Sequence, residues 1–232
     1  MPIECSVIHI CINSLERVQF PLAGVRYNCR VFCYNGSIIL VRPKLHLADD
    51  GNYREGRYFT AWNWEAKLRM AGGGAVPLEK VSLPETPKKR SITTQSETLF
   101  GVGVIQCLDG TVSAETCEEL FTARSPHIAL GLDGVDILGN GSGSHHQLRK
   151  LNTRVDLICE ATAKCGGVYL YANQQGCDGG RLYYDGCALV SADGAVVAQG
   201  TQFSVRDVEV VWAAVDLEAS RSFRSSIASR GQ

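Results

Sequence analysis

An amphipathic helix followed by a run of strands is the feature that most restricts how this chain can fold. The apolar side of the helix is formed by residues spaced three or four apart: Leu148, Leu151, Val155, Ile158 and Thr162. Gly166 and Gly167 end the pattern. Such a stripe needs a sheet to cover, and the segments that follow supply one: "VYLYAN", "RLYYDGCALV", "AVVAQG" and "VEVVWAAV", with Asp193-Gly194 as a hairpin turn.

The first half of the chain adds more strands. "VRYNCRVFCYNGSIILVRPK" predicts two strands joined by a turn at Asn35-Gly36. "LFGVGVIQCL" predicts another strand, Asp109-Gly110 a turn, and "TVSAET" the strand that leads to Cys117. Ser125-Pro126 begins a short helix, which precedes the strand "GVDIL". Because helices and strands alternate and then give way to hairpins, we expect an α/β domain with a mixed sheet, built as two face-to-face sheets under outer helices.

Two stretches lack such patterns. Residues 1–24 show no clear period or helix cap and are left unassigned. Residues 63–97 contain three consecutive glycines at positions 72–74, three prolines and the basic "PKKR", which together predict a surface excursion.

Composition excludes several classes of protein. A chain of 232 residues that is 45% hydrophobic can bury one sizeable core. Its 23 basic and 24 acidic residues give a formal charge of -1, so no net field favours nucleic acid or an anionic membrane. No apolar stretch approaches the roughly 18 residues that span a bilayer, and the start lacks the features of a secretory signal. We therefore expect a cytoplasmic protein with no nucleic-acid or membrane partner.

The ten cysteines are scattered along the sequence. They form no CxxC pair and none of the paired spacings of a zinc site, so we expect no metal site. A chain of this size needs no disulfide framework, and most of its cysteines are expected to pack as small buried hydrophobes.

Cys117 is the exception because of its position in "AETCEELFTARSPH". It stands between the end of a predicted strand and the start of a short helix, where free N–H groups and the positive helix end favour a thiolate. The N–H of Glu118 could also donate to an oxyanion formed on an attacked carbonyl. Since such junctions are common, position alone leaves a structural cysteine as the alternative.

A thiolate at neutral pH needs a cationic neighbour. His145 and His146 open a helix, and His127 follows Cys117 too closely to return to the sulfur by an obvious route. Lys44, at the end of an apolar strand, can point its ammonium into a cleft and is the better candidate. The alternative is a strand-end lysine that reaches out to water.

Several long blocks occur in the order of a known family. They are "RPK", "GNYREGRYFTAW", "CEELFTARSPH", "GSGSHHQLRK", "ANQQGCDGGRLYYDG" and "VAQGTQFSVRDVEVV". Over most of residues 25–232 the chain resembles the nitrilase-type (carbon-nitrogen hydrolase) glutaminase domain of glutamine-dependent NAD synthetases. The resemblance implies a four-layer αββα sandwich, truncated here on its N-terminal side, and a Cys-Glu-Lys triad.

In that family the cysteine attacks the side-chain amide of glutamine, which releases ammonia and leaves a thioester for water to hydrolyse. By motif, Cys117 is the nucleophile, Lys44 supports the thiolate and the oxyanion, and Glu118 supplies the backbone donor. Glu55, in "YREGRYF", resembles the second glutamate that positions the lysine and the substrate.

The segment "GSGSHHQLRK" resembles the one that binds the amino-acid end of glutamine, through Ser142, Ser144 and Arg149. An arginine suits a carboxylate because its planar fork can bind both oxygens. Without the resemblance, "GNGSGS" could be a phosphate-binding loop, although it lacks the full glycine pattern.

Two departures from the family shape our expectations. The general-base glutamate of the family has no match in this chain. Glu4 is not a substitute, because it lies in a different sequence context. Losing a positioned base costs about 10²- to 10⁴-fold in rate. Low activity is therefore expected of this chain alone. No pyrophosphate loop of the synthetase type is present, so ATP and Mg belong to an absent synthetase domain and the glutaminase step needs no cofactor.

We expect a fragment with an unassigned segment (1–24), a glutaminase domain (25–215) and the start of an arm (216–232).

Three functional interpretations follow. The chain is a glutaminase that supplies ammonia for NAD synthesis, an impaired remnant that associates with full-length subunits, or another amidase of the nitrilase branch. The blocks "LYYDGCA" and "GSGSHHQLRK" favour the synthetase pattern over the third interpretation. Glutamine is the expected substrate, and a homo-oligomer or a complex with full-length NAD synthetase is the expected assembly.

Overall fold

The computed structural model describes residues 9–10, 20–22, 24–63, 78–83 and 95–231. The chain forms two compact units, an N-terminal unit (Cys5–Gly103) and a C-terminal unit (Val104–Gln232), each of which is described by itself. Glu4, the glycines at positions 72–74 and the "PKKR" sequence lie outside the described residues.

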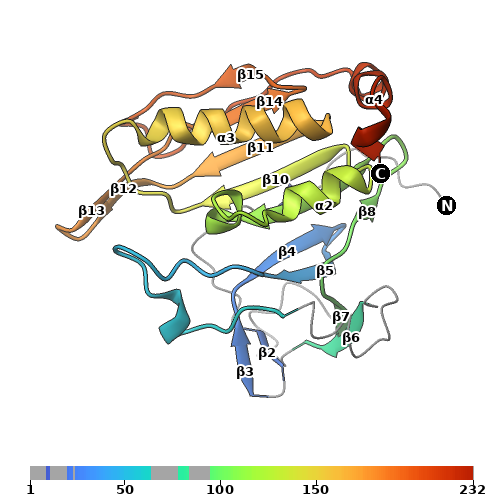
Figure 1. Cartoon of the computed structure of the whole chain (residues 1–232). Helices are drawn as coiled ribbons and strands as arrows, with labels where there is room; N and C mark the ends of the chain where they lie inside the picture. Colours follow the sequence, from blue (N-terminus) through green and yellow to red (C-terminus); the bar gives the residue numbers. More distant parts are fainter. Residues whose placement is uncertain (1–8, 11–19, 23, 64–77, 84–94, 232) are drawn as a thin grey trace. The chain divides into compact units, whose positions relative to one another are not determined.

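The C-terminal unit contains a six-stranded mixed sheet in the order β15-β14-β11-β10-β9-β8 (Figure 1). Its strands are β8 (Ile105–Gln106), β9 (Thr111–Thr116), β10 (Ile137–Ser142), β11 (Val168–Asn173), β14 (Leu189–Ala192) and β15 (Ala195–Gln199). β9, β10 and β11 are parallel, β8 and β14 pair antiparallel with β9 and β11, and β15 pairs antiparallel with β14. A separate hairpin pairs β12 (Gln175–Asp178) with β13 (Leu182–Asp185).

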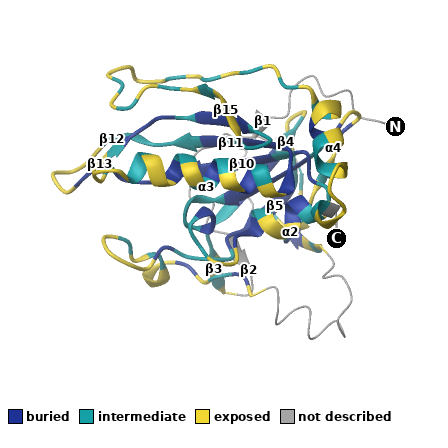
Figure 2. Cartoon of the chain, turned by 45° about the horizontal axis from the view of Figure 1, so that its top comes forward, coloured by how far each residue is buried: buried dark blue, intermediate teal, exposed yellow. Residues whose placement is uncertain are grey.

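Two helices cover one face of this sheet (Figure 1). α2 (Pro126–Leu132) begins after Ser125 as predicted, and α3 (Lys150–Cys165) is the amphipathic helix that the apolar spacing indicates. The inner side of α3 is buried and its outer side is exposed (Figure 2). The shared core consists of apolar and aromatic side chains from the helices and strands: Leu120, Leu130, Val135, Leu138, Ile158, Tyr169, Tyr171 and Leu189.

The N-terminal unit contains a five-stranded sheet in the order β1-β4-β5-β7-β6 and a two-stranded sheet of β2 and β3. The bounds are β1 (His9–Ile10), β2 (Phe20–Leu22), β3 (Val25–Tyr27), β4 (Cys29–Tyr34), β5 (Ser37–Pro43), β6 (Glu79–Ser82) and β7 (Glu97–Phe100). The turn between β4 and β5 has φ 47° at Asn35 and φ 75° at Gly36, which is the backbone that this dipeptide favours. Trp62 and Phe100 meet edge to face in the core, with ring centroids 5.0 Å apart.

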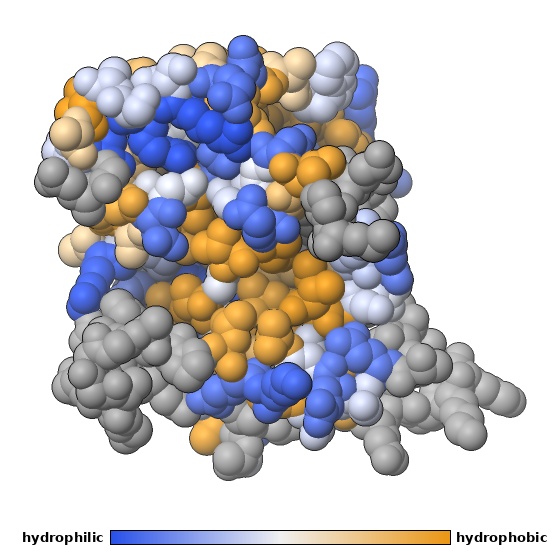
Figure 3. Space-filling model, turned by 90° about the vertical axis from the view of Figure 1, so that its right-hand side faces the viewer, coloured by the Kyte–Doolittle hydropathy of each residue, from blue (hydrophilic) through white to orange (hydrophobic). Residues whose placement is uncertain are grey.

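Three expected strands differ in the structure. The stretch "LFGVGVIQCL" is divided into β7 and β8, because Gly101 takes φ 140° and turns the chain. "RLYYDGCALV" is divided into β13 and β14, because Gly186 and Cys187 both have left-handed backbones. "VEVVWAAV" forms no strand, and Val208, Val210 and Trp212 lie largely exposed on it. Other hydrophobic side chains reach the surface on the face drawn in Figure 3.

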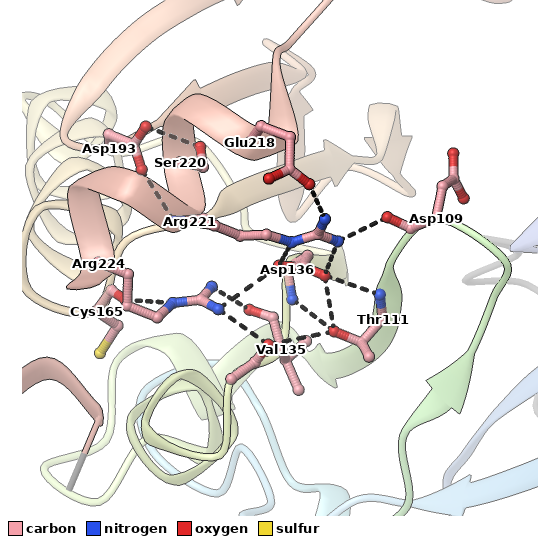
Figure 4. A network of polar contacts seen from close by, with 12 residues as sticks. Asp109, Thr111, Val135, Asp136, Cys165, Asp193, Glu218, Ser220, Arg221 and Arg224 are labelled. Atoms are coloured by element: carbon pink, nitrogen blue, oxygen red, sulfur yellow. Dashed lines mark hydrogen bonds and ion pairs between the residues drawn. The ribbon is translucent and has the colours of Figure 1, made fainter.

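The C-terminal helix α4 (Leu217–Ser225) is attached by arginines to the segment before β10 (Figure 4). The short helix η3 (Ala228–Gly231) follows it. Arg221 donates to Asp136 at 2.9 Å, just before β10. Arg224 donates to the carbonyls of Gly134 and Val135 at 3.0 and 2.8 Å. These bonds satisfy carbonyls that no helix or strand pairs, so they fix the start of β10.

The cysteines follow the sequence expectation in part. Cys107, Cys165 and Cys187 are buried, whereas Cys177 is exposed and the other described cysteines are half-buried. Among the described residues, no helix is long and apolar enough to cross a membrane.

Candidate active site

The carboxyl ends of three parallel strands place Cys117, Ser142 and Asn173 along one edge of the sheet in the C-terminal unit. Cys117 directly follows β9, Ser142 ends β10 and Asn173 ends β11. Thr116 pairs with Gly141, and Ser142 pairs with Asn173. In α/β sheets the carboxyl edge is where ligands bind, because loops and helix starts converge there. This edge is therefore the candidate active site.

Cys117 occupies a left-handed turn. Its φ is 49°, and it begins the 3₁₀ helix η2 (Cys117–Leu120), so the helix expected after the cysteine is a single tight turn. A residue other than glycine held in this region costs about 1–3 kcal/mol and persists where its surroundings fix it. Glu119 helps to fix the turn, because its Oε2 accepts the N–H of Thr116 at 2.6 Å. The half-buried thiol of Cys117 is thus presented at a strained bend.

Asn140 contacts the backbone of this turn, and the sequence analysis did not single it out. Its Oδ1 accepts the backbone N–H of Cys117 at 2.9 Å and the hydroxyl of Ser142 at 3.1 Å. Its Nδ2 donates to the phenol of Tyr169 at 2.8 Å. The sequence signal for Asn140 is its polar side chain within a strand that the helices cover. A buried polar group of this kind needs defined hydrogen-bond partners.

Glu115 is a fully buried acid on β9. It accepts the phenol proton of Tyr169, and its Oε2 accepts the backbone N–H of His127 at 3.0 Å. The Nδ1 of His127 lies 3.2 Å from both carboxylate oxygens. Burial favours a higher pKa for Glu115, but the hydrogen bonds and charge of His127 and the bond from Tyr169 outweigh it and lower the pKa. His127 thus pairs with Glu115, and not with the thiol.

The predicted substrate-binding residues lie at different depths. Ser144 is buried, and its N–H donates to Asn173 Oδ1 at 2.8 Å. Its hydroxyl has no hydrogen-bond partner within the described part of the chain. Arg149 is exposed and directly precedes α3, with φ 67°, and Glu118 is half-buried in the first turn of η2.

A buried ion pair lies next to Asn173, at the end of β11. Arg154, on the inner side of α3, donates to Asp185 at 2.5 Å, and both side chains are almost fully buried. Asp185 also accepts from Gln202 at 2.8 Å. Burial favours a higher pKa for Asp185, but the bonds from Gln202 and Arg154 outweigh it and lower the pKa. The sequence analysis did not single out Arg154 or its partner.

Lys44 and Glu55 contact each other in the N-terminal unit. The ammonium of Lys44 lies 2.5 Å from Glu55 Oε2, and the side chain of Lys44 is 3% exposed. Glu55 also accepts from Asn28 at 2.5 Å and from the N–H of Ala48 at 2.6 Å. The alternative, a lysine that reaches out to water, is therefore wrong.

The sequence model of carbon-nitrogen hydrolases matches residues 4–225, nearly the whole chain. The chain belongs to the carbon-nitrogen hydrolase family. Among curated members, the glutamine-dependent NAD(+) synthetase of Saccharomyces cerevisiae is 58% identical over 208 residues, which cover 90% of this chain and 28% of the yeast protein. The mouse enzyme of the same name is 52% identical over 207 residues, which cover 89% of this chain and 27% of that protein. This carbon-nitrogen hydrolase therefore spans less than a third of the synthetases it matches.

Solved structures confirm the α/β, nitrilase-like fold. A glutamine-dependent NAD(+) synthetase from Cytophaga hutchinsonii aligns with a TM-score of 0.63 at 24% identity, covering 82% of this chain and 28% of that one. A carbon-nitrogen hydrolase from Helicobacter pylori G27 aligns with a TM-score of 0.66 at 18% identity, covering 89% of this chain and 62% of that one. The 58% and 52% identities to the yeast and mouse synthetases exceed the 18% identity to the Helicobacter pylori hydrolase.

Proposed function

We propose that this chain is a glutaminase unit, which releases ammonia from the side-chain amide of glutamine so that nicotinate adenine dinucleotide can be amidated to NAD. The single observation that supports it most is the thiol of Cys117, held in a left-handed turn at the carboxyl edge of β9. The 58% identity to a protein named glutamine-dependent NAD(+) synthetase supports the choice of glutamine.

In the proposed reaction the thiolate of Cys117 attacks the side-chain carbonyl carbon of glutamine. The tetrahedral intermediate carries its negative charge on the former carbonyl oxygen, to which the N–H of Glu118 donates. The carbon–nitrogen bond then breaks, and the leaving nitrogen takes a proton to depart as ammonia. Water adds to the resulting thioester, the carbon–sulfur bond breaks, and glutamate and the free thiol return.

Lys44 supports the thiolate and the oxyanion in this proposal, and Glu55 holds the lysine in place through their 2.5 Å contact. Ser142, Ser144 and Arg149 bind the amino-acid end of glutamine. Burial of Ser144 next to Asn173 supports a polar subsite, since a buried hydroxyl gains from a ligand partner. The step uses no cofactor, whereas ATP and Mg serve the synthetase step that consumes the ammonia. A cytoplasmic location and association with a full-length synthetase complete the proposal.

Mass spectrometry after treatment with a diazoketone analogue of glutamine tests the nucleophile. The adduct is expected on Cys117 and is lost in Cys117→Ala. Cys177→Ala is the matched control, because Cys177 is the exposed thiol and its removal is expected to leave the labelling of Cys117 unchanged. An adduct on Cys177 alone would contradict the proposal. Ammonia release from glutamine then measures turnover, which separates an active glutaminase from a remnant that is only acylated.

A further inference from the structure

The side-chain amide of Asn140 has one orientation that fits its surroundings. Its oxygen faces two donors, the N–H of Cys117 at 2.9 Å and the hydroxyl of Ser142 at 3.1 Å. Its NH₂ group faces the phenol oxygen of Tyr169 at 2.8 Å. Turning the amide over would place the NH₂ group of the buried Asn140 against the N–H of Cys117, which would then lose its acceptor.

Tyr169 fixes the orientation of the Asn140 side-chain amide. Its phenol accepts a hydrogen bond from Asn140 and donates its own proton to Glu115. An ionised Glu115 can only accept, so the chain of donors runs in one direction, from Asn140 through Tyr169 to the carboxylate. His127 completes the set by donating its backbone N–H to Glu115 at 3.0 Å.

The backbone N–H of Cys117, which donates to the Asn140 oxygen, has no strand partner. Pairing between β9 and β10 ends at Thr116 and Gly141, so the N–H of Cys117 has left the ladder. The amide of Asn140 supplies the acceptor that the ladder no longer offers. This bond holds the peptide before Cys117 at the point where φ becomes 49°.

We propose that Asn140 is a positioning residue for the nucleophile: it holds Cys117 in the left-handed turn that presents the thiol, and Tyr169 and Glu115 keep its amide in the required orientation. The inference rests on the proposed function only in treating the Cys117 thiol as the nucleophile. One consequence concerns the oxyanion. The N–H of Cys117 is already used by Asn140, so it does not serve as an oxyanion donor.

Two substitutions test the chain of bonds at different distances from the thiol. Asn140→Leu keeps the approximate volume but removes the acceptor of the Cys117 N–H. Tyr169→Phe leaves that bond possible but removes the group that orients the amide, and it keeps the ring in the core. Thr162→Val is the matched control, because Thr162 is a buried hydroxyl of the same unit whose bonds run to Ser191 and Gly194.

The first measurement is hydrogen–deuterium exchange of the Cys117 amide, which needs no glutamine chemistry. Exchange is expected to quicken by about tenfold in Tyr169→Phe, as loss of one net hydrogen bond implies, and by more in Asn140→Leu. Thr162→Val is expected to leave it unchanged. Equal exchange of the Cys117 amide in Tyr169→Phe, Asn140→Leu and the unmodified chain would overturn the proposal, whatever the outcome for glutamine.

The second measurement compares the rate of labelling of Cys117 by the diazoketone glutamine analogue with its rate of labelling by iodoacetamide. Because a small misplacement of a reacting group costs about 10²-fold, the analogue rate is expected to fall by about that factor in Asn140→Leu and less in Tyr169→Phe. The iodoacetamide rate should change little, since the thiol remains accessible. A fall in both rates together, or in the Thr162→Val control as well, would show a general loss of thiol reactivity and count against positioning. Absence of analogue labelling in the unmodified chain would contradict the proposed function, and amide exchange would still decide the positioning role.

Discussion

The ammonium of Lys44 lies 2.5 Å from the carboxylate of Glu55, and this contact closes the loop between them. The backbone reinforces it, because Lys44 donates its N–H to the carbonyl of Asn28 and Glu55 donates its N–H to the carbonyl of Ala48. Glu55 in turn accepts from the side chain of Asn28 and the N–H of Ala48. The carboxylate of Glu55 therefore links the side chains of Lys44 and Asn28 to the backbone of the loop at Ala48.

Replacing Glu55 by glutamine should weaken the N-terminal unit. The neutral amide offers one acceptor where the carboxylate received three donors, and it leaves the ammonium of Lys44 buried without its counter-charge. Breaking a buried pair by removing one partner costs about 3–5 kcal/mol, and the amide retains part of the bonding, so we expect about 3 kcal/mol. Hydrogen–deuterium exchange should quicken in β5, with β11 of the other unit unaffected.

Asp50→Asn is the control for that change. Asp50 is an exposed acid in the same loop, so its neutralisation should alter the exchange of β5 little. If Asp50→Asn and Glu55→Gln have equal effects, the specific pairing of Lys44 with Glu55 contributes nothing beyond the charge of the loop.

Arg154→Met should destabilise the C-terminal unit more than Arg154→Met combined with Asp185→Leu. The single change leaves the fully buried carboxylate of Asp185 without its cation, which costs about 3–5 kcal/mol. Removing both charges recovers part of that cost, because buried ion pairs are often replaceable by apolar side chains. Recovery is incomplete, since Gln202 and Asn173 lose the acceptor they share. Urea unfolding of the two variants and of Asp185→Leu measures the coupling, and strict additivity would contradict it.

Gly131→Ala should overpack the contact between α2 and α3. A Cβ at Gly131 would lie 2.5 Å from the Cβ of Cys165, which is too close for any rotamer of that cysteine to relieve. Inserting a methyl group into a packed core costs about 1–3 kcal/mol. Gly180→Ala is the matched control, because nothing lies within 4 Å of a Cβ there. A melting temperature lowered equally by both substitutions would show that the helix contact is not the cause.

The sequence predicted elements whose signals are local. The apolar spacing gave α3, the Asn35-Gly36 dipeptide gave the turn between β4 and β5, and Asp193-Gly194 gave the turn between β14 and β15. Long apolar runs were less reliable, because a break such as the one at Gly101 depends on a glycine backbone that periodicity does not report.

In the candidate site, too, the sequence predicted features set by neighbouring residues but not contacts between residues far apart in the chain. The position of Cys117 after a strand followed from neighbouring residues alone. Asn140 and Tyr169 could not be paired with it, because their contact depends on the register of three strands that lie far apart in the sequence. The pairing of Lys44 with Glu55 came from the resemblance to a family, and not from their spacing.

Stability should fall in acid through three buried or partly buried acids. The pKa values of Glu115, Asp136 and Asp185 are lowered in the folded chain, because their hydrogen bonds to His127, to Arg221 and Thr111, and to Gln202 and Arg154 outweigh the effect of burial. A carboxyl group with a lower pKa in the folded state binds a proton more readily when unfolded. Its contribution to stability is therefore complete above the ordinary pKa of 4.5 for Glu115 or 3.8 for the aspartates, and it is lost as the pH falls through the folded value.

Urea unfolding as a function of pH measures this loss. The midpoint should be nearly constant from neutral pH to about pH 5 and should fall steeply below it. Asp136→Asn should flatten the acid slope, because the amide no longer titrates, and should lower the plateau, because Arg221 loses its charged acceptor (Figure 4). Asp207→Asn, at an exposed position, is the control and should leave both slope and plateau nearly unchanged. If the slope of Asp136→Asn equals that of the unmodified chain, Asp136 does not take part in the acid transition, and the contact between α4 and the start of β10 is independent of pH.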